Sequence, residues 1–248
     1  MKRIRLTAPY QMTWEEAPTP EITPDEALVR VEVVGICGSD THAYRGRHPF
    51  ITLPVVPGHE FTGTVVETGD EKWQGWVGKR VTAVPSLVCG QCFNCQHGRY
   101  NICNELRVIG CQADGAMAEF VKVPVEMLVE LPTAMSFETG ALVEPLAVAV
   151  GAVQKAGSVA GSRLVVFGAG PIGLFVLQVA KAYGPREVIV VEPQADRRQL
   201  ALQLGADVAL DPAADIVAHL QDRYGPDGID LSFECVGVAS TVNTAIRI

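Results

Sequence analysis

Of the 248 residues, 48% are hydrophobic and 19% are charged, which is the composition of a folded protein rather than of a disordered one. Lys and Arg number 20 against 28 Asp and Glu, and the net charge of −8 argues against a nucleic-acid partner, whose phosphates require a basic face. Because no apolar run reaches the roughly 18 residues of a membrane span and no signal peptide is recognisable, we expect a cytoplasmic protein without a membrane partner.

Short β-rich segments separated by glycine and proline fill the first half of the chain. No 3.6-residue periodicity is sustained there, so we expect a compact all-β lobe. Trp73 and Trp76 stand in a loop-like stretch and are expected to pack against this lobe. The predicted strands are Ala27–Val33, Phe61–Glu67, Lys79–Val84 and Ala118–Val123.

Beyond Ser136 the pattern changes to helices alternating with strands. An alanine-rich helix is expected over Phe137–Gln154, with a break or kink at Pro145. The alternation that follows predicts a parallel sheet with helices on both faces. The predicted strands are Arg163–Phe167, Glu187–Glu192, Asp207–Leu210 and Gly228–Cys235, and the predicted helices are Pro171–Ala182, Asp196–Leu204 and Ala213–Tyr224, with a last helix beginning near Ser240.

The change of pattern predicts two domains, a β-rich one over residues 1–150 and a doubly wound α/β one over residues 151–248. A dinucleotide-binding sheet has about six strands built from two halves. The second domain supplies only four predicted strands. We therefore expect the second half of the sheet to be missing and the chain to be incomplete at its C-terminus.

The motif Gly168-Ala-Gly-Pro-Ile-Gly173 follows an apolar strand and opens an apolar helix. In that context the glycines predict a tight turn and a close approach to a pyrophosphate resting on the helix N-terminus. Glu192 stands nineteen residues after the last glycine, where its carboxylate can accept hydrogen bonds from ribose hydroxyls and repel a 2′-phosphate. This favours NAD over NADP, although Arg197 and Arg198 lie close by. The alternative is a glycine turn without a nucleotide.

Four cysteines at short spacing occupy one loop that contains Gly and Asn. Four thiolates describe a closed tetrahedral zinc site, and with no vacant position that site should be structural. The alternatives are free thiols or a redox pair. The four are Cys89, Cys92, Cys95 and Cys103, while Cys111 and Cys235 fit no site and are interpreted as small apolar residues.

A second set of candidate ligands lies in the stretch from Gly35 to Glu60. Cys37, His59 and Glu60 offer the sulfur, nitrogen and oxygen donors that zinc accepts, and three protein ligands leave a position open for a substrate. Glu144 lies within an apolar segment, where a carboxylate is costly unless it is paired or bound to metal. We therefore interpret it as a further ligand, direct or through a water. Taken singly, Cys37 and His59 could also be ordinary buried residues.

Together these motifs resemble the zinc-dependent medium-chain dehydrogenase/reductase family. The residues that carry the resemblance are G-I-C-G-S-D at Gly35–Asp40, P-G-H-E at Pro57–Glu60, the four-cysteine loop, Glu144-Pro145 and GAGPIG. The resemblance implies a GroES-like catalytic domain followed by a Rossmann domain. It also implies two zinc ions per chain, one catalytic and one structural, and a homo-oligomer, tetramer or dimer.

Roles follow from the resemblance residue by residue. The catalytic zinc ligands fall on Cys37, His59 and Glu60, with Glu144 close to the metal, where other alcohol dehydrogenases of the family have a cysteine. Ser39 matches a hydroxyl beside the substrate and His42 a proton-relay histidine. The matched cofactor positions are Gly168, Gly170, Pro171, Ile172, Gly173, Glu192 and Arg197.

The activity expected from these matches is hydride transfer from a secondary alcohol to NAD. The substrate would be a small molecule, namely a polyol, a sugar acid or a vicinal diol, and its proton would leave through Ser39, the nicotinamide ribose and His42. A rival enzyme is L-threonine 3-dehydrogenase. A rival of another class is a catalytically idle fragment or scaffold that retains the zinc and nucleotide sites. A zinc-finger nucleic-acid binder is excluded by the charge.

Overall fold

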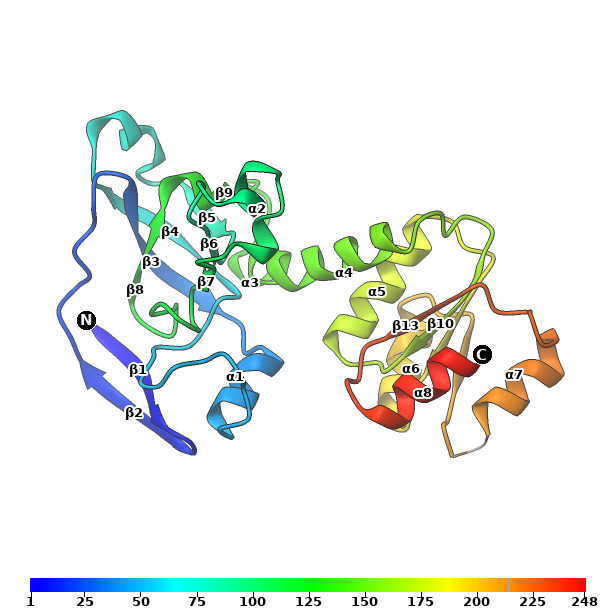
Figure 1. Cartoon of the computed structure of the whole chain (residues 1–248). Helices are drawn as coiled ribbons and strands as arrows, with labels where there is room; N and C mark the ends of the chain where they lie inside the picture. The colour runs from blue at the N-terminus through cyan, green and yellow to red at the C-terminus, as the bar shows by residue number, and fades with distance from the viewer. Residues whose placement is uncertain (214) are drawn as a thin grey trace. The chain divides into compact units, whose positions relative to one another are not determined.

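The computed structural model describes residues 1–213 and 215–248. They form two compact units, Met1–Glu144 and Pro145–Ile248, coloured blue to green and green to red in Figure 1. This division lies inside helix α4 (Val143–Lys155), six residues before the expected boundary after residue 150. No helix in the described ranges is long and apolar enough to cross a membrane.

The first unit is built on a five-stranded antiparallel sheet. Its strands, in spatial order, are β8 (Phe120–Pro124), β3 (Glu26–Val34), β4 (Phe61–Thr68), β5 (Arg80–Ala83) and β9 (Leu128–Glu130). All four predicted strands are present, each within two residues of the predicted ends. The core of this unit includes Val29, Phe61 and Val81, which are fully buried.

The other strands of the first unit have no strong signal in the sequence. The hairpin β1 (Lys2–Ala8) and β2 (Gln11–Glu16) is mostly exposed and rich in charge, so neither strand shows a clear apolar face. Strands β6 (Ser86–Leu87) and β7 (Arg107–Val108) are too short for a pattern. Trp73 and Trp76 pack against the core as expected, on the 3₁₀ helix η1 (Glu71–Trp76).

The expectation of an all-β lobe is wrong, because helices interrupt the sheet. Helix α1 (Gly38–Tyr44) follows β3, and α2 (Phe93–Gln96) and α3 (Phe137–Ala141) are shorter. Each is too short to display a sustained 3.6-residue period in the sequence. Two 3₁₀ turns, η2 (Tyr100–Ile102) and η3 (Val125–Met127), complete the unit.

The long helix expected over Phe137–Gln154 is two helices, α3 and α4, separated by Leu142. Pro145 does not lie at the break. It is the third residue of α4, in the first turn, where the N–H that proline lacks would have no partner within the helix.

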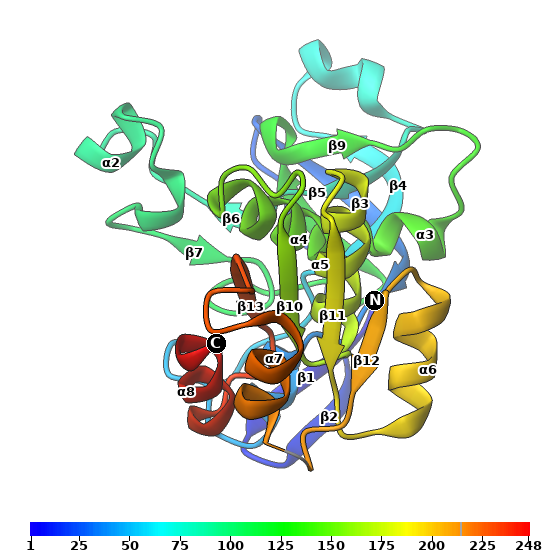
Figure 2. The ribbon, with the colours of Figure 1, turned by 90° about the vertical axis from the view of Figure 1, so that its right-hand side faces the viewer.

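The second unit is built on a four-stranded parallel sheet of order β12-β11-β10-β13. Figure 2 shows β10, β11 and β12 side by side. The strands are β10 (Arg163–Phe167), β11 (Glu187–Val191), β12 (Val208–Leu210) and β13 (Leu231–Glu234). The chain leaves β10 for β11 on one side and later returns to β13 on the other. The switch point of the sheet therefore lies at the carboxyl end of β10.

Alternate residues of these strands enter two cores, one on each face of the sheet. Leu164 and Val166 pack with Leu177 of helix α5 (Pro171–Ala182), whereas Val165 and Phe167 pack with Leu220 of α7 (Ile216–Tyr224). The prediction of helices on both faces of a parallel sheet is confirmed.

The remaining helices of the second unit are α6 (Ala195–Gln203) and α8 (Ala239–Arg247). Helix α7 begins at Ile216, with the Asp215 carboxylate accepting the Ala218 N–H at 3.1 Å, rather than at the expected Ala213. Residue 214, which the predicted helix included, lies outside the described residues.

Leu177→Ala should destabilise the second unit. The Leu177 side chain is fully buried, so its truncation leaves a cavity and should lower the free energy of unfolding by about 2–5 kcal/mol. Leu202→Ala is the matched control, because Leu202 is 48% exposed and should lose less than about 1 kcal/mol. Urea denaturation followed by circular dichroism measures both, and equal effects would contradict this assignment of the core.

Candidate functional site

The first unit brings three of the predicted ligands together. One donor atom from each of Cys37, His59 and Glu60 lies within 4.8 Å of the other two. Cys37 follows β3 and caps α1, and the His59-Glu60 pair immediately precedes β4. The antiparallel pairing of β3 with β4 therefore joins residues that are 22 positions apart in the sequence (59 against 37).

Gly35 makes room for the carboxylate of this cluster. Its N–H donates to the Glu60 carbonyl at 2.6 Å, and a Cβ at this position would lie only 2.6 Å from Glu60 Oε2. A larger residue would force the Glu60 carboxylate to shift from its present position. The glycine thus permits the close approach of two strand ends with the carboxylate where it lies.

The imidazole of His59 is electrostatically prepared for a cation. Burial acts to lower its pKa, but the hydrogen bond to Cys37 and the charges of Asp40, Cys37 and Glu144 outweigh burial and raise the pKa to about 9. Nδ1 of His59 is buried without a hydrogen-bond partner among the described residues. The negative groups that favour a protonated His59 would also attract a divalent metal, and the buried Nδ1 has no other partner among the described residues. Both features fit a metal site.

The other predicted catalytic residues, Glu144, Ser39 and His42, differ in their burial and in their relation to this cluster. Glu144 stands outside the converging three, and its pKa is raised by burial and by the Glu60 charge, against the lowering effect of His59. Ser39 Oγ is buried and has no partner among the described residues, so it is available to a ligand. His42 lies on α1 and is exposed to solvent.

Asp40 is a site residue that the sequence reasoning missed. Its carboxylate is 3% exposed, and Oδ2 accepts the Cys37 N–H at 2.8 Å, which fixes the start of α1. Oδ1 is buried without a partner among the described residues, and the charge raises the pKa of His59. Its position three residues after Cys37, where an acidic side chain caps a helix, is the sequence signal that could have indicated it.

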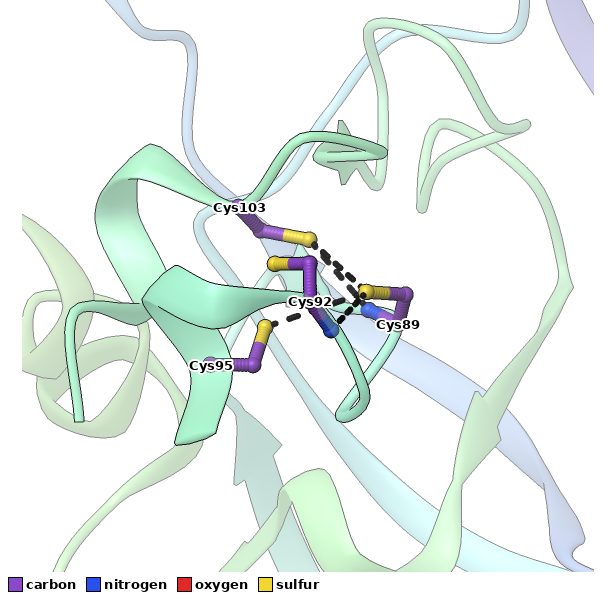
Figure 3. Close-up of side chains that lie close together, drawn as sticks. All are labelled: Cys89, Cys92, Cys95 and Cys103. Atoms are coloured by element: carbon purple, nitrogen blue, oxygen red, sulfur yellow. Dashed lines mark hydrogen bonds between the residues drawn. The ribbon is translucent and has the colours of Figure 1, made fainter. Parts of the chain in front are cut away.

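A second cluster lies in the loop that the β6–β7 pairing closes. The sulfurs of Cys89, Cys92, Cys95 and Cys103 all lie within 4.8 Å of one another and point toward a common centre (Figure 3). Backbone N–H groups orient them, since Cys89 N–H donates to Cys103 Sγ and Cys92 N–H to Cys89 Sγ, both at 3.4 Å. The spacing and the backbone donors are those of a tetrathiolate zinc site.

Three of the four thiols have pKa values that are shifted, and not all in the same direction. Backbone N–H groups of Asn104 and Cys95 lower the pKa of Cys92 to about 6, and a similar hydrogen bond from Cys89 lowers that of Cys103. Burial instead raises the pKa of Cys95 to about 12. Amide donors that favour the thiolate forms of Cys92 and Cys103 suit a bound cation, and the four-sulfur donor set fits zinc.

The glycine motif follows β10 and forms the N-terminus of α5 in the second unit. A Cβ at Gly173 would lie 1.9 Å from the Gly168 carbonyl oxygen, so only glycine permits this packing of helix against strand. A Cβ at Gly170 would meet nothing within 4 Å, which leaves open space beside the loop. Pro171 is the first residue of α5 and is exposed, and Ile172 is half-buried. This arrangement suits a pyrophosphate.

Glu192 follows β11 beside this loop and is only 4% exposed. Its Oε2 accepts the Ala169 N–H at 2.8 Å, and its Oε1 accepts the Gln194 N–H at 3.0 Å. These two amide donors fix the carboxylate against the glycine motif. Each oxygen has a second lone pair for a ribose hydroxyl.

The two arginines after Glu192 differ in exposure and in their ion pairs. Arg197 is exposed and forms no ion pair within the described part of the chain. Arg198 turns inward, and its Nη1 lies 2.7 Å from the carbonyl oxygens of Glu192 and Pro193 and 3.0 Å from Asp211 Oδ2.

A loop on the other side of the switch point was also missed by the sequence reasoning. Glu234 ends β13, and its carboxylate accepts the N–H groups of Val236 and Gly237 and the Thr241 hydroxyl at 2.7–3.1 Å. Val236 packs against Gly168, where a Cβ would lie 2.8 Å from Val236 Cγ2. Glu234 therefore fixes the loop after β13 that packs against the glycine motif.

Comparison with known proteins agrees with both units. Residues 23–133 match the alcohol dehydrogenase GroES-like domain, and residues 171–248 match the zinc-binding dehydrogenase domain. The chain is 38% identical to D-arabitol-phosphate dehydrogenase of Enterococcus avium, with 99% of this chain covering 72% of that protein. It is 37% identical to (R,R)-butanediol dehydrogenase of Bacillus subtilis, with 100% of this chain covering 74% of that protein.

Among solved structures, a zinc-binding dehydrogenase of Sinorhizobium meliloti 1021 bound to NADP superposes with a TM-score of 0.94 at 40% identity. The match covers 99% of this chain and 72% of that one. The expected GroES-like and Rossmann folds are thus confirmed, and the chain belongs to the zinc-dependent alcohol dehydrogenases of the medium-chain dehydrogenase/reductase family.

Proposed function

We propose that the chain oxidises a secondary alcohol of a polyol, a sugar acid or a vicinal diol, using NAD and two zinc ions, one catalytic and one structural. The observation that carries this proposal is the convergence of Cys37, His59 and Glu60 in a member of a zinc-dependent dehydrogenase family. Three converging donors leave a coordination position for the substrate, whereas the four-cysteine cluster leaves none.

Bound zinc would supply Lewis-acid polarisation of the alcohol oxygen, and NAD would supply the hydride acceptor. The protein residues set the conditions for this chemistry. Cys37, His59 and Glu60 hold the metal, and the half-buried Glu144 adds negative charge near His59 without joining the converging donors. A direct bond from Glu144 to the metal would require its carboxylate to move toward the other three.

Two further groups would move the proton. Ser39 Oγ is buried and free of partners in the described chain, so it can relay a proton, taking one from a substrate hydroxyl as it passes its own toward the nicotinamide ribose and His42. His42 is exposed on the same helix and can pass a proton to solvent. Asp40 holds the start of that helix in place through its bond to the Cys37 N–H.

NAD is the proposed cofactor because of Glu192. A buried carboxylate that two backbone amides hold in position repels a 2′-phosphate and accepts hydrogen bonds from ribose hydroxyls. A solved relative is bound to NADP, so the selectivity of the present chain for NAD has to be measured by binding of both nucleotides. The homo-oligomeric state and the cytoplasmic location stay predictions.

A substrate panel tests the proposed function. NADH formation should be detectable by absorbance with at least one polyol, sugar acid or vicinal diol. Activity with L-threonine alone would favour the threonine dehydrogenase reading. The absence of turnover with every compound, while zinc and NAD still bind, would favour the idle scaffold.

Cys37→Ser should remove one metal site and the activity. The substitution takes the thiolate out of the converging three, so we expect the zinc content to fall from about two to about one ion per chain and kcat/KM to fall at least about 100-fold. Atomic emission of the dialysed protein measures the metal. The control is Cys111→Ala, which alters a buried cysteine that belongs to neither cluster and should retain both ions. Retention of full activity by Cys37→Ser would refute the assignment.

Cys95→Ser should lower the thermal stability of the chain. The loop of the four-cysteine cluster has little buried surface of its own, and a structural zinc contributes its binding free energy to folding. We expect one zinc ion per chain to be lost and the thermal midpoint to fall by about 5 °C or more, with nucleotide binding retained. Scanning calorimetry measures the midpoint, and an unchanged value would contradict a structural metal in this loop.

A further inference from the structure

Arg198 and Asp211 form an ion pair next to the residue that recognises ribose. Arg198 lies on α6 and Asp211 directly follows β12, yet Arg198 Nη1 lies 3.0 Å from Asp211 Oδ2. The Glu192 N–H donates to the Leu210 carbonyl at 3.0 Å, so the ends of β11 and β12 are joined at this edge of the sheet. Glu192, Arg198 and Asp211 therefore meet at the carboxyl ends of two neighbouring strands.

The pair holds Arg198 in a fixed, inward position. Its Nη1 carries two hydrogens and faces three acceptors, the carbonyl oxygens of Glu192 and Pro193 and the Asp211 carboxylate. Asp211 is itself fixed, because its Oδ1 accepts the Ala213 N–H at 2.9 Å. The Arg198 side chain is only 21% exposed, so the pair is shielded in part from solvent.

An arginine after this strand is the group that accommodates a 2′-phosphate in NADP-binding Rossmann domains. A 2′-phosphate would add nearly two negative charges beside Glu192. Of the two arginines present, Arg197 has no ion-pair partner in the described chain, whereas the charge of Arg198 is already neutralised. Glu192 and a 2′-phosphate would then face only one unpaired guanidinium, that of Arg197.

We propose that Asp211 determines nucleotide selectivity by sequestering Arg198 from the 2′-phosphate position. Glu192 provides the direct contact with ribose, and Asp211 removes the guanidinium that would otherwise offset its repulsion of NADP. The inference rests on the proposed binding of a dinucleotide at the glycine motif. It assigns a specificity role to a residue that contacts no ribose hydroxyl itself.

The test is equilibrium binding by calorimetry to the full chain, with NAD⁺ and NADP⁺ and with 5′-AMP and adenosine 2′,5′-bisphosphate as probes. Asp211→Asn keeps an oxygen for the Ala213 N–H but removes the charge that holds Arg198. NADP⁺ and the bisphosphate should bind about tenfold more tightly, while NAD⁺ and AMP change less than about twofold.

The double variant Arg198→Ala/Asp211→Asn separates sequestration from simple charge repulsion. Compared with Arg198→Ala alone, the Asp211 change should then improve NADP⁺ binding less than about threefold. The charge control is Asp222→Asn on α7, since Asp222 is exposed and forms no ion pair in the described chain. It should leave all four dissociation constants unchanged.

No gain of NADP⁺ affinity in Asp211→Asn would overturn the inference, as would an equal gain without Arg198. Either result would leave the proposed function intact, provided that NAD⁺ binds. A wild-type chain that binds none of the four probes would overturn the proposed function and this inference with it.

Discussion

The pairing of β3 with β4 is the constraint on which the candidate metal site depends. Cys37 lies just beyond one strand and His59-Glu60 just before the other, so their donor atoms meet only when Val34 and Phe61 are in register. A slip of one residue would turn every side chain of a strand to the opposite face. The buried Phe61 resists such a slip, because the core of the first unit is built around it. The packing of the sheet core therefore determines where the ligand side chains lie.

The four-cysteine cluster depends on a different kind of constraint. Its ligands are close in sequence, and only the two-residue strands β6 and β7 close the loop that carries them. A loop with so few apolar contacts has little free energy of its own to oppose chain entropy. A metal bound by the four cysteines would therefore be part of the fold in this region, whereas one bound at the Cys37 cluster would be added to a sheet that packs without it. Zinc would thus have a structural role in the loop and a catalytic role at the Cys37 cluster, because the loop and the sheet differ in stability.

How far the sequence could predict these sites depends on how local each one is. The cysteine spacing and the glycine motif are short patterns, and both lie in the structure where the pattern placed them. The contacts of Asp40, Glu234 and Arg198 were not predictable in the same way, because they depend on turns and strand ends brought together by the fold. Helix α1 was missed because seven residues are too few to show a period. Glu144 was singled out by its apolar neighbours, yet its distance from the other ligands is a tertiary property that sequence spacing does not contain.

At the nucleotide site, carboxylates organise the backbone before any ligand binds. Glu192 ties the glycine motif to the end of β11, and Glu234 ties the loop after β13 into a turn that packs on Gly168. Both carboxylates accept backbone amide donors, so acidic side chains flank the glycine motif on two sides. A dinucleotide brings two negative phosphates to this place, and the α5 N-terminus must offset the repulsion. A third negative group at the ribose would have no comparable helix end to meet it, and the proposed sequestration of Arg198 by Asp211 would leave that group without this guanidinium.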